Sequence, residues 1–278
     1  MSPTLASHRY GKSRVRLVKV RRLSDRDEIV DLTLDIQLEG AFEAVYMEGD
    51  NRSCLPTDTM KNTVYAMARK SPIAHAESFA AALADHFAAK PGVTQARISV
   101  VEDRWDRIAA SPVPHPHAFV QGSAEQWTTA VTRDTRRLEI VSGLTNLVVL
   151  KTAGSAFAGF PRDEYTTLPE TQDRLLATSI SASWTYRPGT TDFGVRERIR
   201  SAFLSTFAAH QSASVQHTLY AMANAALGVA ADVLDITLTM PNRHHIPVDL
   251  TPFGLDNPNE IFVATDQPFG LIEATVRR

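Results

Sequence analysis

The chain has 278 residues, of which 44% are hydrophobic and 22% are charged, a composition typical of a folded globular protein. Its 29 Lys and Arg residues against 31 Asp and Glu residues leave a net charge of −2, which argues against a nucleic-acid partner. The single cysteine, Cys54, excludes an intrachain disulfide and a multi-cysteine metal site.

The first half begins with two predicted strands. The first covers residues 15–20, with a change of register between Leu17 and Val18. Residues 30–38 then alternate apolar and polar side chains without error. This period of two is typical of a strand with one buried face and one wet face.

Two helices and further strands follow in the first half. Apolar residues recur at helical spacing from Met60 and again from Phe79. Asp58 is placed to accept backbone N–H bonds at the start of the first of these helices. We predict that strands return at about residues 96–108 and 119–132.

The second half repeats this order of elements. Apolar stripes at helical spacing start at Val195 and Val215 and predict another pair of helices. Like the first pair, they are flanked by extended segments. The predicted strands of this half are residues 138–151, 180–186 and 234–240, followed by a last pair of strands over about 261–275.

The order ββααββ therefore occurs twice, at a spacing that marks an internal duplication. We expect an α+β chain whose first repeat is residues 1–135 and whose second is residues 136–278, each an antiparallel sheet with helices on one face. The sheet edges need cover, and pairing them with another copy would close a barrel. An oligomer is therefore expected.

Familiar catalytic motifs are missing from the sequence. It has no phosphate-binding glycine loop, no Gly-x-Gly-x-x-Gly, no Gly-x-Ser-x-Gly and no His-Glu-x-x-His. Nucleotide hydrolysis, NAD-dependent hydride transfer and serine-esterase chemistry are correspondingly disfavoured. Lys12 and Thr57 are not distinguished by spacing, since they are also consistent with a solvated basic face and a helix start.

Histidines offer candidate polar sites. His115 and His117 would point the same way on a strand, but no clear third metal ligand accompanies them, and a structural pair is favoured. His244 and His245 are adjacent and face opposite ways, so at most one serves a given site. Asn242 and His244 share a face and combine an amide with a proton carrier, although such a histidine is more often structural than catalytic.

Ordered segments along nearly the whole chain resemble those of the urate oxidases (uricases), cofactor-independent enzymes of purine degradation. The resemblance implies a tandem tunnelling fold (T-fold), assembled as a homotetramer around a β-barrel tunnel with active sites at subunit interfaces. The segments are 9–12 (RYGK), 38–40 (LEG), 57–63 (TDTMKNT), 115–117 (HPH), 150–152 (LKT), 157–160 (FAGF), 162–168 (RDEYTTL), 173–174 (DR), 212–216 (SASVQ) and 238–244 (LTMPNRH).

The resemblance also implies the reaction and the residues that perform it. Urate would be oxidised by dioxygen and water to 5-hydroxyisourate and hydrogen peroxide, with no cofactor and no metal. Lys12, Thr57 and His244 would form a proton relay, with the first two supplied by a neighbouring subunit. Arg174 and Gln216 would bind the edge of the urate ring, and Phe157 would stack on its face. Backbone groups of Val215 and Asp58 would contact the ring, and Asn242 and Thr57 would hold dioxygen. The substrate-binding residues are therefore Thr57, Asp58, Phe157, Arg174, Val215, Gln216 and Asn242.

Two other functions are left open. One is a zinc-dependent enzyme of the same fold that processes pterins or purines, which would need three converging His or Cys ligands. The other is a purine-binding scaffold without catalysis. The sequence has no run of about 18 apolar residues for a membrane span. Lacking a signal peptide and a C-terminal peroxisomal signal, the chain is expected to be cytoplasmic.

Overall fold

The computed structural model describes residues 3–110, 112–265 and 267–278. The chain forms two compact units, each described by itself below. Unit 1 comprises Met1–Gly143 and Thr185–Phe193; unit 2 comprises Leu144–Trp184 and Gly194–Arg278. Both consist of antiparallel strands with helices, which confirms the α+β class. The predicted boundary between the repeats, after residue 135, stays a prediction.

The sheet of unit 1 is antiparallel, in the order β1-β2-β3-β6. The register change of its first strand lies between Lys12 and Val15, where Arg14 has a φ of 56°. The prediction of a change between Leu17 and Val18 is wrong, because Val18 is an apolar residue that faces outward, at 54% exposure. The strands are β1 (Tyr10–Arg22), β2 (Asp27–Gly40), β3 (Val93–Asp103) and β6 (Gln126–Asp134).

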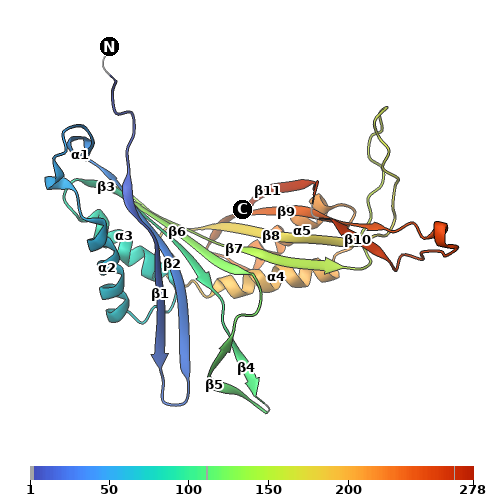
Figure 1. Ribbon diagram of the computed structural model, residues 1–278, viewed down its shortest axis with the longest axis horizontal. Coiled ribbons are helices and arrows are strands. Elements are labelled where there is room, and N and C mark those ends of the chain that lie inside the picture. Colours follow the sequence, from blue (N-terminus) through green and yellow to red (C-terminus); the bar gives the residue numbers. More distant parts are fainter. Residues whose placement is uncertain (1–2, 111, 266) are drawn as a thin grey trace. The chain divides into compact units, whose positions relative to one another are not determined.

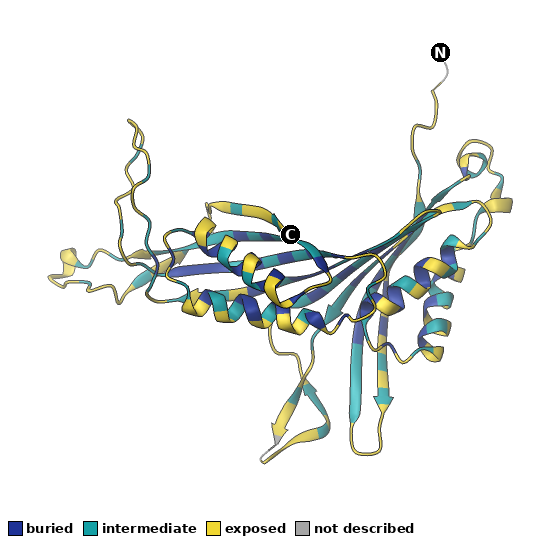
Figure 2. Cartoon of the chain, turned by 180° about the vertical axis from the view of Figure 1, so that it is seen from behind, coloured by how far each residue is buried: buried dark blue, intermediate teal, exposed yellow. Residues whose placement is uncertain are grey.

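Helices α2 (Thr57–Lys70) and α3 (Ala76–Ala88) lie along one face of this sheet (Figure 1). They are held by burial of the apolar stripes read from the sequence, and each large apolar side chain buried contributes about 1.5–3 kcal/mol. Figure 2 shows the dark, buried side of each helix turned towards the strands. Completely buried residues include Leu34, Ile36, Met60, Val64, Leu83 and Phe87. The short elements α1 (Glu43–Met47) and η1 (Asn51–Ser53) precede α2.

Asp58 does not cap helix α2, contrary to the prediction. The helix already begins at Thr57, so Asp58 lies inside its first turn and its side chain reaches the next turn. Its carboxylate accepts hydrogen bonds from Lys61 Nζ at 2.5 Å and from Asn62 Nδ2 at 2.9 Å. The Lys61 bond is the main reason why the pKa of Asp58 lies below its usual value.

The predicted strand at 96–108 is in fact two strands. Strand β3 ends at Asp103, and β4 (Asp106–Ala110) pairs with β5 (Val113–Val120) in a separate two-stranded sheet. The chain leaves the main sheet at Trp105, whose Nε1 donates to Asp31 Oδ2 at 3.1 Å. The alternation of apolar and polar residues does not mark where the pairing partner of the chain changes.

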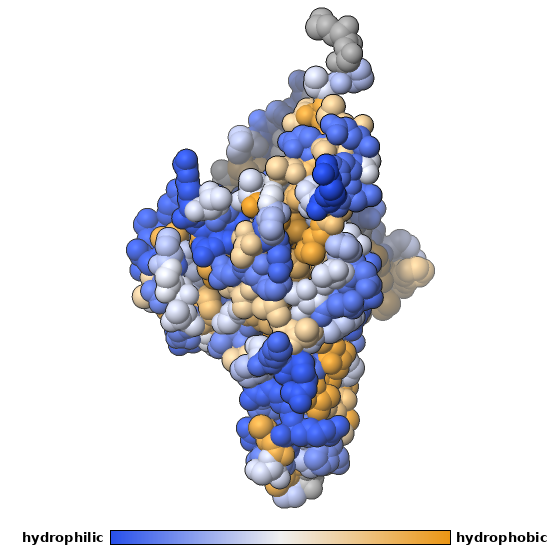
Figure 3. All heavy atoms as spheres, turned by 90° about the vertical axis from the view of Figure 1, so that its left-hand side faces the viewer, coloured by the Kyte–Doolittle hydropathy of each residue, from blue (hydrophilic) through white to orange (hydrophobic). Residues whose placement is uncertain are grey.

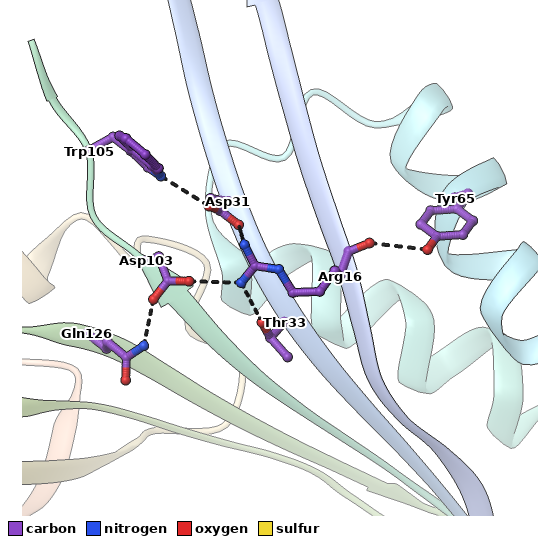
Figure 4. A network of polar contacts seen from close by, with 7 residues as sticks. All are labelled: Arg16, Asp31, Thr33, Tyr65, Asp103, Trp105 and Gln126. Atoms are coloured by element: carbon purple, nitrogen blue, oxygen red, sulfur yellow. Dashed lines mark hydrogen bonds and ion pairs between the residues drawn. The ribbon is translucent and has the colours of Figure 1, made fainter. Parts of the chain in front are cut away.

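The face of the unit 1 sheet that lacks helices carries a charged network, drawn in Figure 4. Arg16 donates to Asp31 Oδ1 at 2.6 Å and to Asp103 Oδ2 at 2.9 Å. Trp105 Nε1 also donates to Asp31, and Gln126 Nε2 also donates to Asp103. Strands β1, β2 and β3 are thereby tied together by charge-assisted bonds as well as by backbone pairing.

Unit 2 is built on strands β7 (Leu138–Lys151) and β8 (Leu176–Tyr186), which extend past its bounds, and on β9 (Val233–Pro247). Strand β11 (Leu271–Arg277) pairs with the first part of β9, and β10 (Phe262–Thr265) pairs with its end. Helices α4 (Val195–Ala209) and α5 (Val215–Val229) pack together against these strands (Figure 1). The 3-10 turn η2 is Thr251–Phe253.

Strand β1 stands at one end of the strand order, so within the described ranges one of its edges has no neighbouring strand. This strand exposes Val18 and Val20, at 54% and 46%. On the face of the molecule drawn in Figure 3, hydrophobic patches interrupt the hydrophilic surface. An exposed edge strand of this kind is a surface on which another strand can pair.

Candidate active site

A cavity of about 340 Å³ lies within unit 2. Its polar wall includes Arg174 and His244, two of the residues singled out in the sequence, and His245 also lines it. Thr152, Thr171, Asp173 and Asn259 add polar groups to the wall, and the rest of the lining is apolar. A cavity of this size with a few converging polar groups is typical of a small-molecule site. The apolar lining residues are Leu168, Pro169, Leu175, Ile246, Pro247 and Phe262.

Arg174 supplies an unsatisfied positive charge to this region. Burial lowers the pKa of its guanidinium below the usual arginine value. Its Nε is buried and has no hydrogen-bond partner among the described residues. The guanidinium carbon lies 5.2 Å from the centroid of the Phe157 ring. A half-buried arginine fork whose buried Nε lacks a partner, set against an aromatic ring, is suited to a flat anionic ligand.

Phe157 is itself supported from one side by another aromatic ring. Phe160 stacks on it with centroids 4.9 Å apart and planes inclined by only 15°. The guanidinium of Arg162 lies 5.8 Å from the Phe160 centroid. Both phenylalanines are half-buried. Phe160 was not assigned a role from the sequence, although it falls in the quoted segment 157–160.

The start of helix α5 places Val215 and Gln216 in its first turn. Ser214 caps the helix, and its Oγ accepts the N–H of His217 at 3.1 Å. The first N–H groups of a helix have no intrahelical acceptor and carry the positive end of its dipole. Val215 is 4% exposed, so its contribution is limited to its backbone, whereas the Gln216 side chain is exposed.

Asn242 and His244 lie on β9, two residues apart and therefore on one face of the strand. The backbone N–H of Asn242 donates to Gly270 O at 2.8 Å. The strand runs on to Pro247 rather than ending near Met240, so both residues sit inside a paired strand. Both His244 and His245 line the cavity, and the expectation that at most one of them serves a given site stays a prediction.

Unit 1 carries the other predicted residues, grouped at the start of α2. Lys12 lies on β1 at the register change, and Thr57 and Asp58 begin the helix. The charge of Lys12 helps to lower the pKa of Asp58, after the larger effect of Lys61. Tyr10, two residues before Lys12, accepts the N–H of Leu55 through its hydroxyl at 2.9 Å.

The half-buried Tyr10 hydroxyl has its pKa raised to about 12, chiefly by burial and then by the nearby Cys54. By accepting the Leu55 N–H, this hydroxyl holds the segment that leads into Thr57. Tyr10 was quoted within the segment 9–12, but its contact with residue 55 could not be read from the sequence. The contact depends on how β1 packs against the loop before α2.

The predicted site residues thus fall into two sets. Phe157, Arg174, Val215, Gln216, Asn242 and His244 belong to unit 2, and Lys12, Thr57 and Asp58 belong to unit 1. Their assigned roles remain predictions.

The described ranges contain no group of three or more His, Cys, Asp or Glu side chains that could hold a metal ion. His115 and His117 lie on β5 with ring centroids 6.1 Å apart, and His117 Nδ1 is 3.3 Å from Asp27 Oδ2. The structural role favoured for this pair from the sequence stays a prediction. None of the helices in the described part of the chain has the length and apolarity needed to cross a membrane.

Comparisons with known proteins agree along the whole chain. The family model described as Uricase matches residues 8–132 and 140–273. The uricase of Arthrobacter globiformis is 45% identical over 276 residues, covering 99% of this chain and 90% of that protein. The uricase of Cyberlindnera jadinii is 36% identical over 297 residues, covering 100% of this chain and 98% of that protein.

A solved structure gives the same result. The crystal structure of the Arthrobacter globiformis uricase superposes with a TM-score of 0.95 at 45% identity, covering 100% of this chain and 96% of that chain. The fold is therefore that of the T-fold proteins, as predicted, with an antiparallel-sheet and two-helix unit used twice. Within this class, the chain belongs to the uricase family.

Proposed function

We propose that this protein oxidises urate with dioxygen and water, giving 5-hydroxyisourate and hydrogen peroxide. Membership of the uricase family makes it an oxidoreductase of urate degradation. The single observation that best supports the proposal is the buried, unpartnered Nε of Arg174, aligned beside the Phe157 ring. Urate is a flat anion, which needs a planar cationic donor at its edge and an aromatic surface on its face.

In this proposal the unit 2 residues bind the ring. Arg174 donates to the purine edge, and the Gln216 amide and the Val215 backbone add hydrogen bonds from the start of α5. Phe157 stacks on the ring and is backed by Phe160 at 4.9 Å. Arg174 has its pKa lowered by burial, so binding an anion relieves an unfavourable buried charge. The negative ligand also gains from the helix dipole.

The remaining residues handle oxygen and protons. Asn242 and Thr57 would hold dioxygen, and later water, above the ring. Lys12, Thr57 and His244 would carry protons away from urate and back to the reduced oxygen. Two electrons pass from the purine to dioxygen, which leaves as hydrogen peroxide, and water adds to the oxidised ring. Holding the reactants together and moving protons are the tasks left to the protein.

A homotetramer forms part of the proposal. Lys12, Thr57 and Asp58 of one subunit would face the unit 2 residues of its neighbour, so that each active site needs two chains. The exposed apolar edge of β1 supports this assembly, because an unpaired edge strand is otherwise a liability. Sedimentation should then give a tetramer, and a stable, active monomer would contradict it.

The two alternative functions make different predictions. A zinc-dependent T-fold enzyme would need a converging ligand set, and the described residues provide none. A purine-binding scaffold would bind urate without consuming oxygen. Neither alternative is favoured by a specific observation in the described part of the chain.

The test uses purified protein treated with a chelator, with its metal content measured. We expect urate absorbance to fall in aerated buffer, with one dioxygen consumed and one hydrogen peroxide formed per urate. Urate binding without oxygen uptake would favour the scaffold. Activity that depends on restored zinc would favour the metal enzyme, and untouched urate would overturn the proposal.

A further inference from the structure

We propose that Asp173 is a positioning residue that sets the Phe157 ring and the Arg174 guanidinium for substrate. This inference rests on the proposed function. In the sequence, Asp173 belongs to the segment 173–174 (DR) and has no role assigned to it. It does not need to touch substrate for this role, because it acts through the backbone of the segment that carries Phe157.

Residues 154–157 form the middle of three short extended segments within unit 2. On one side Ser155 bridges to Ser212, with Ala156 N–H donating to Ser212 O at 2.7 Å. On the other side Phe157 bridges to Thr171, through reciprocal bonds of 2.8 and 3.0 Å. The middle segment therefore connects the chain before Arg174 with the chain that leads into helix α5.

Asp173 fixes the beginning of this middle segment. Its Oδ1 accepts the N–H of Gly154 at 2.7 Å and the N–H of Ser155 at 3.2 Å. Gly154 has a φ of +75°, a conformation that other residues rarely adopt, so the chain turns sharply here. Hydrogen bonds to an ionised acceptor are stronger than neutral ones. One carboxylate thus holds two consecutive amides at the turn.

The turn is also linked directly to Arg174, through Ser155. The backbone N–H of Arg174 donates to Ser155 O at 2.7 Å, so Ser155 is held by Asp173 at its N–H and by Arg174 at its carbonyl. Ser155 is itself completely buried. Movement of the 154–155 turn would therefore shift both the Arg174 backbone and the Phe157 ring, which is two residues further along.

Asp173 also avoids neutralising the neighbouring arginine. Its Oδ1 accepts from backbone amides. Among the described residues no ion pair joins Asp173 to Arg174, and the Nε of Arg174 has no hydrogen-bond partner. The nearby cation is Lys151, whose Nζ donates to His210 O at 2.6 Å and so holds the segment before α5. The carboxylate therefore orders the site while leaving the Arg174 donors for the ligand.

The experiment compares three variants in the full-length protein. Asp173→Ala removes the oxygen that accepts both N–H groups, and Asp173→Asn can keep an oxygen at that position without the negative charge. Asp249→Ala is the matched control, because Asp249 is also an exposed carboxylate of unit 2 that accepts a backbone N–H, that of Thr251 at 3.0 Å. Urate binding is measured without oxygen, and KM and kcat are measured with it.

We expect Asp173→Ala to weaken anaerobic urate binding and to raise KM by about 10- to 100-fold, since small displacements of positioning groups have effects of this order. Its kcat at saturation should change much less. Asp173→Asn should recover most of the affinity, and Asp249→Ala should bind urate like the wild type. If Asp173→Ala does not fold, Asp173→Ser takes its place, with a weaker affinity than Asp173→Asn expected.

The inference is overturned if Asp173→Ala binds urate as tightly as the wild type, or if Asp173→Asn is as defective as Asp173→Ala. A merely structural role would lower the melting temperatures of Asp173→Ala and Asp249→Ala alike and leave urate affinity intact. If the wild type itself neither binds nor oxidises urate, the proposed function fails, and this result is distinguishable from a failure confined to the variants.

Discussion

The second helix of each unit starts in a different environment. In unit 1, Glu77 is the second residue of α3, is completely buried, and accepts a bond from Ser142 Oγ at 2.6 Å. In unit 2, Gln216 is the second residue of α5 and is exposed. Helix α5 is capped by the Ser214 side chain, whereas α3 has no side-chain cap. A repeated architecture thus gives one closed helix start and one open helix start.

The comparison teaches that duplication of a fold does not duplicate a binding site. The carboxylate of Glu77 is completely buried in the core of unit 1: Oε1 accepts from Ser142, and Oε2 has no hydrogen-bond partner among the described residues, so this side chain is closed off from solvent. The open start of α5 lies in the unit that also holds Arg174 and Phe157. Unit 1 instead contributes Lys12 and Thr57 at its other helix, in the proposed relay. The predictions below separate binding in unit 2 from proton transfer and stability in unit 1.

The largest effect is expected for Arg174→Ala in unit 2. Loss of the buried guanidinium should weaken anaerobic urate binding by about 30-fold or more, as for other truncated partners of buried charge pairs. Titration of urate without oxygen measures this change. Arg198→Ala, at an exposed position on α4, should bind urate normally. Equal affinity in the Arg174 variant would remove the main support for the proposed function.

Lys12→Met should affect turnover rather than binding. Removal of a proton-transfer group lowers kcat by about 10²- to 10⁴-fold, while urate affinity should change little. Steady-state oxygen uptake at saturating urate gives kcat. Lys70→Met, at the exposed far end of α2, is the control and should keep full activity. A Lys12 variant with normal kcat would exclude Lys12 from the relay.

Glu77→Ala tests the closed helix start directly. It removes the acceptor of the buried Ser142 hydroxyl, so the free energy of unfolding should fall by about 1–3 kcal/mol. Urate affinity should not change. Gln216→Ala should do the opposite, with little loss of stability and weaker urate binding. Both variants are measured by urea unfolding and by anaerobic urate titration. Equal changes of stability and of urate affinity in the two variants would contradict the difference between the two helix starts.

The smallest effect concerns the charged network of unit 1. Burial alone would raise the pKa of Asp103, but hydrogen bonds from Gln126 and Arg16 and the charge of Arg16 bring it below the usual value. A lowered folded pKa stabilises the protein above the unfolded pKa of about 3.9, and this stabilisation is lost as the pH falls through the folded value.

Asp103→Asn should therefore lose less stability than the wild type between about pH 5 and pH 3. Urea midpoints at the two pH values measure the difference. The exposed Asp25 can serve as control, because Asp25→Asn should leave the acid profile as in the wild type. An unchanged profile in Asp103→Asn would show that the network does not contribute to acid stability.

Local patterns predicted most of the regular elements. The strand at 138–151 and the helices that start at Val195 and Val215 lie where periodicity placed them, because burial of one face imposes its period on the sequence. The exit of the chain at Trp105 and the register change after Lys12 were not predictable. They depend on which strands pair, and pairing leaves no periodic signal.

The sequence by itself determined the duplicated α+β order, the buried stripes and, through its quoted segments, the family. Only the tertiary structure showed that Asp173 holds the turn at Gly154 and that Tyr10 holds Leu55. It alone showed that Arg174 has an unmet donor and that Glu77 is closed off from any ligand. The physical reason is that periodicity records which side of an element is buried, whereas hydrogen bonds between distant segments depend on distances that arise only when the chain has packed.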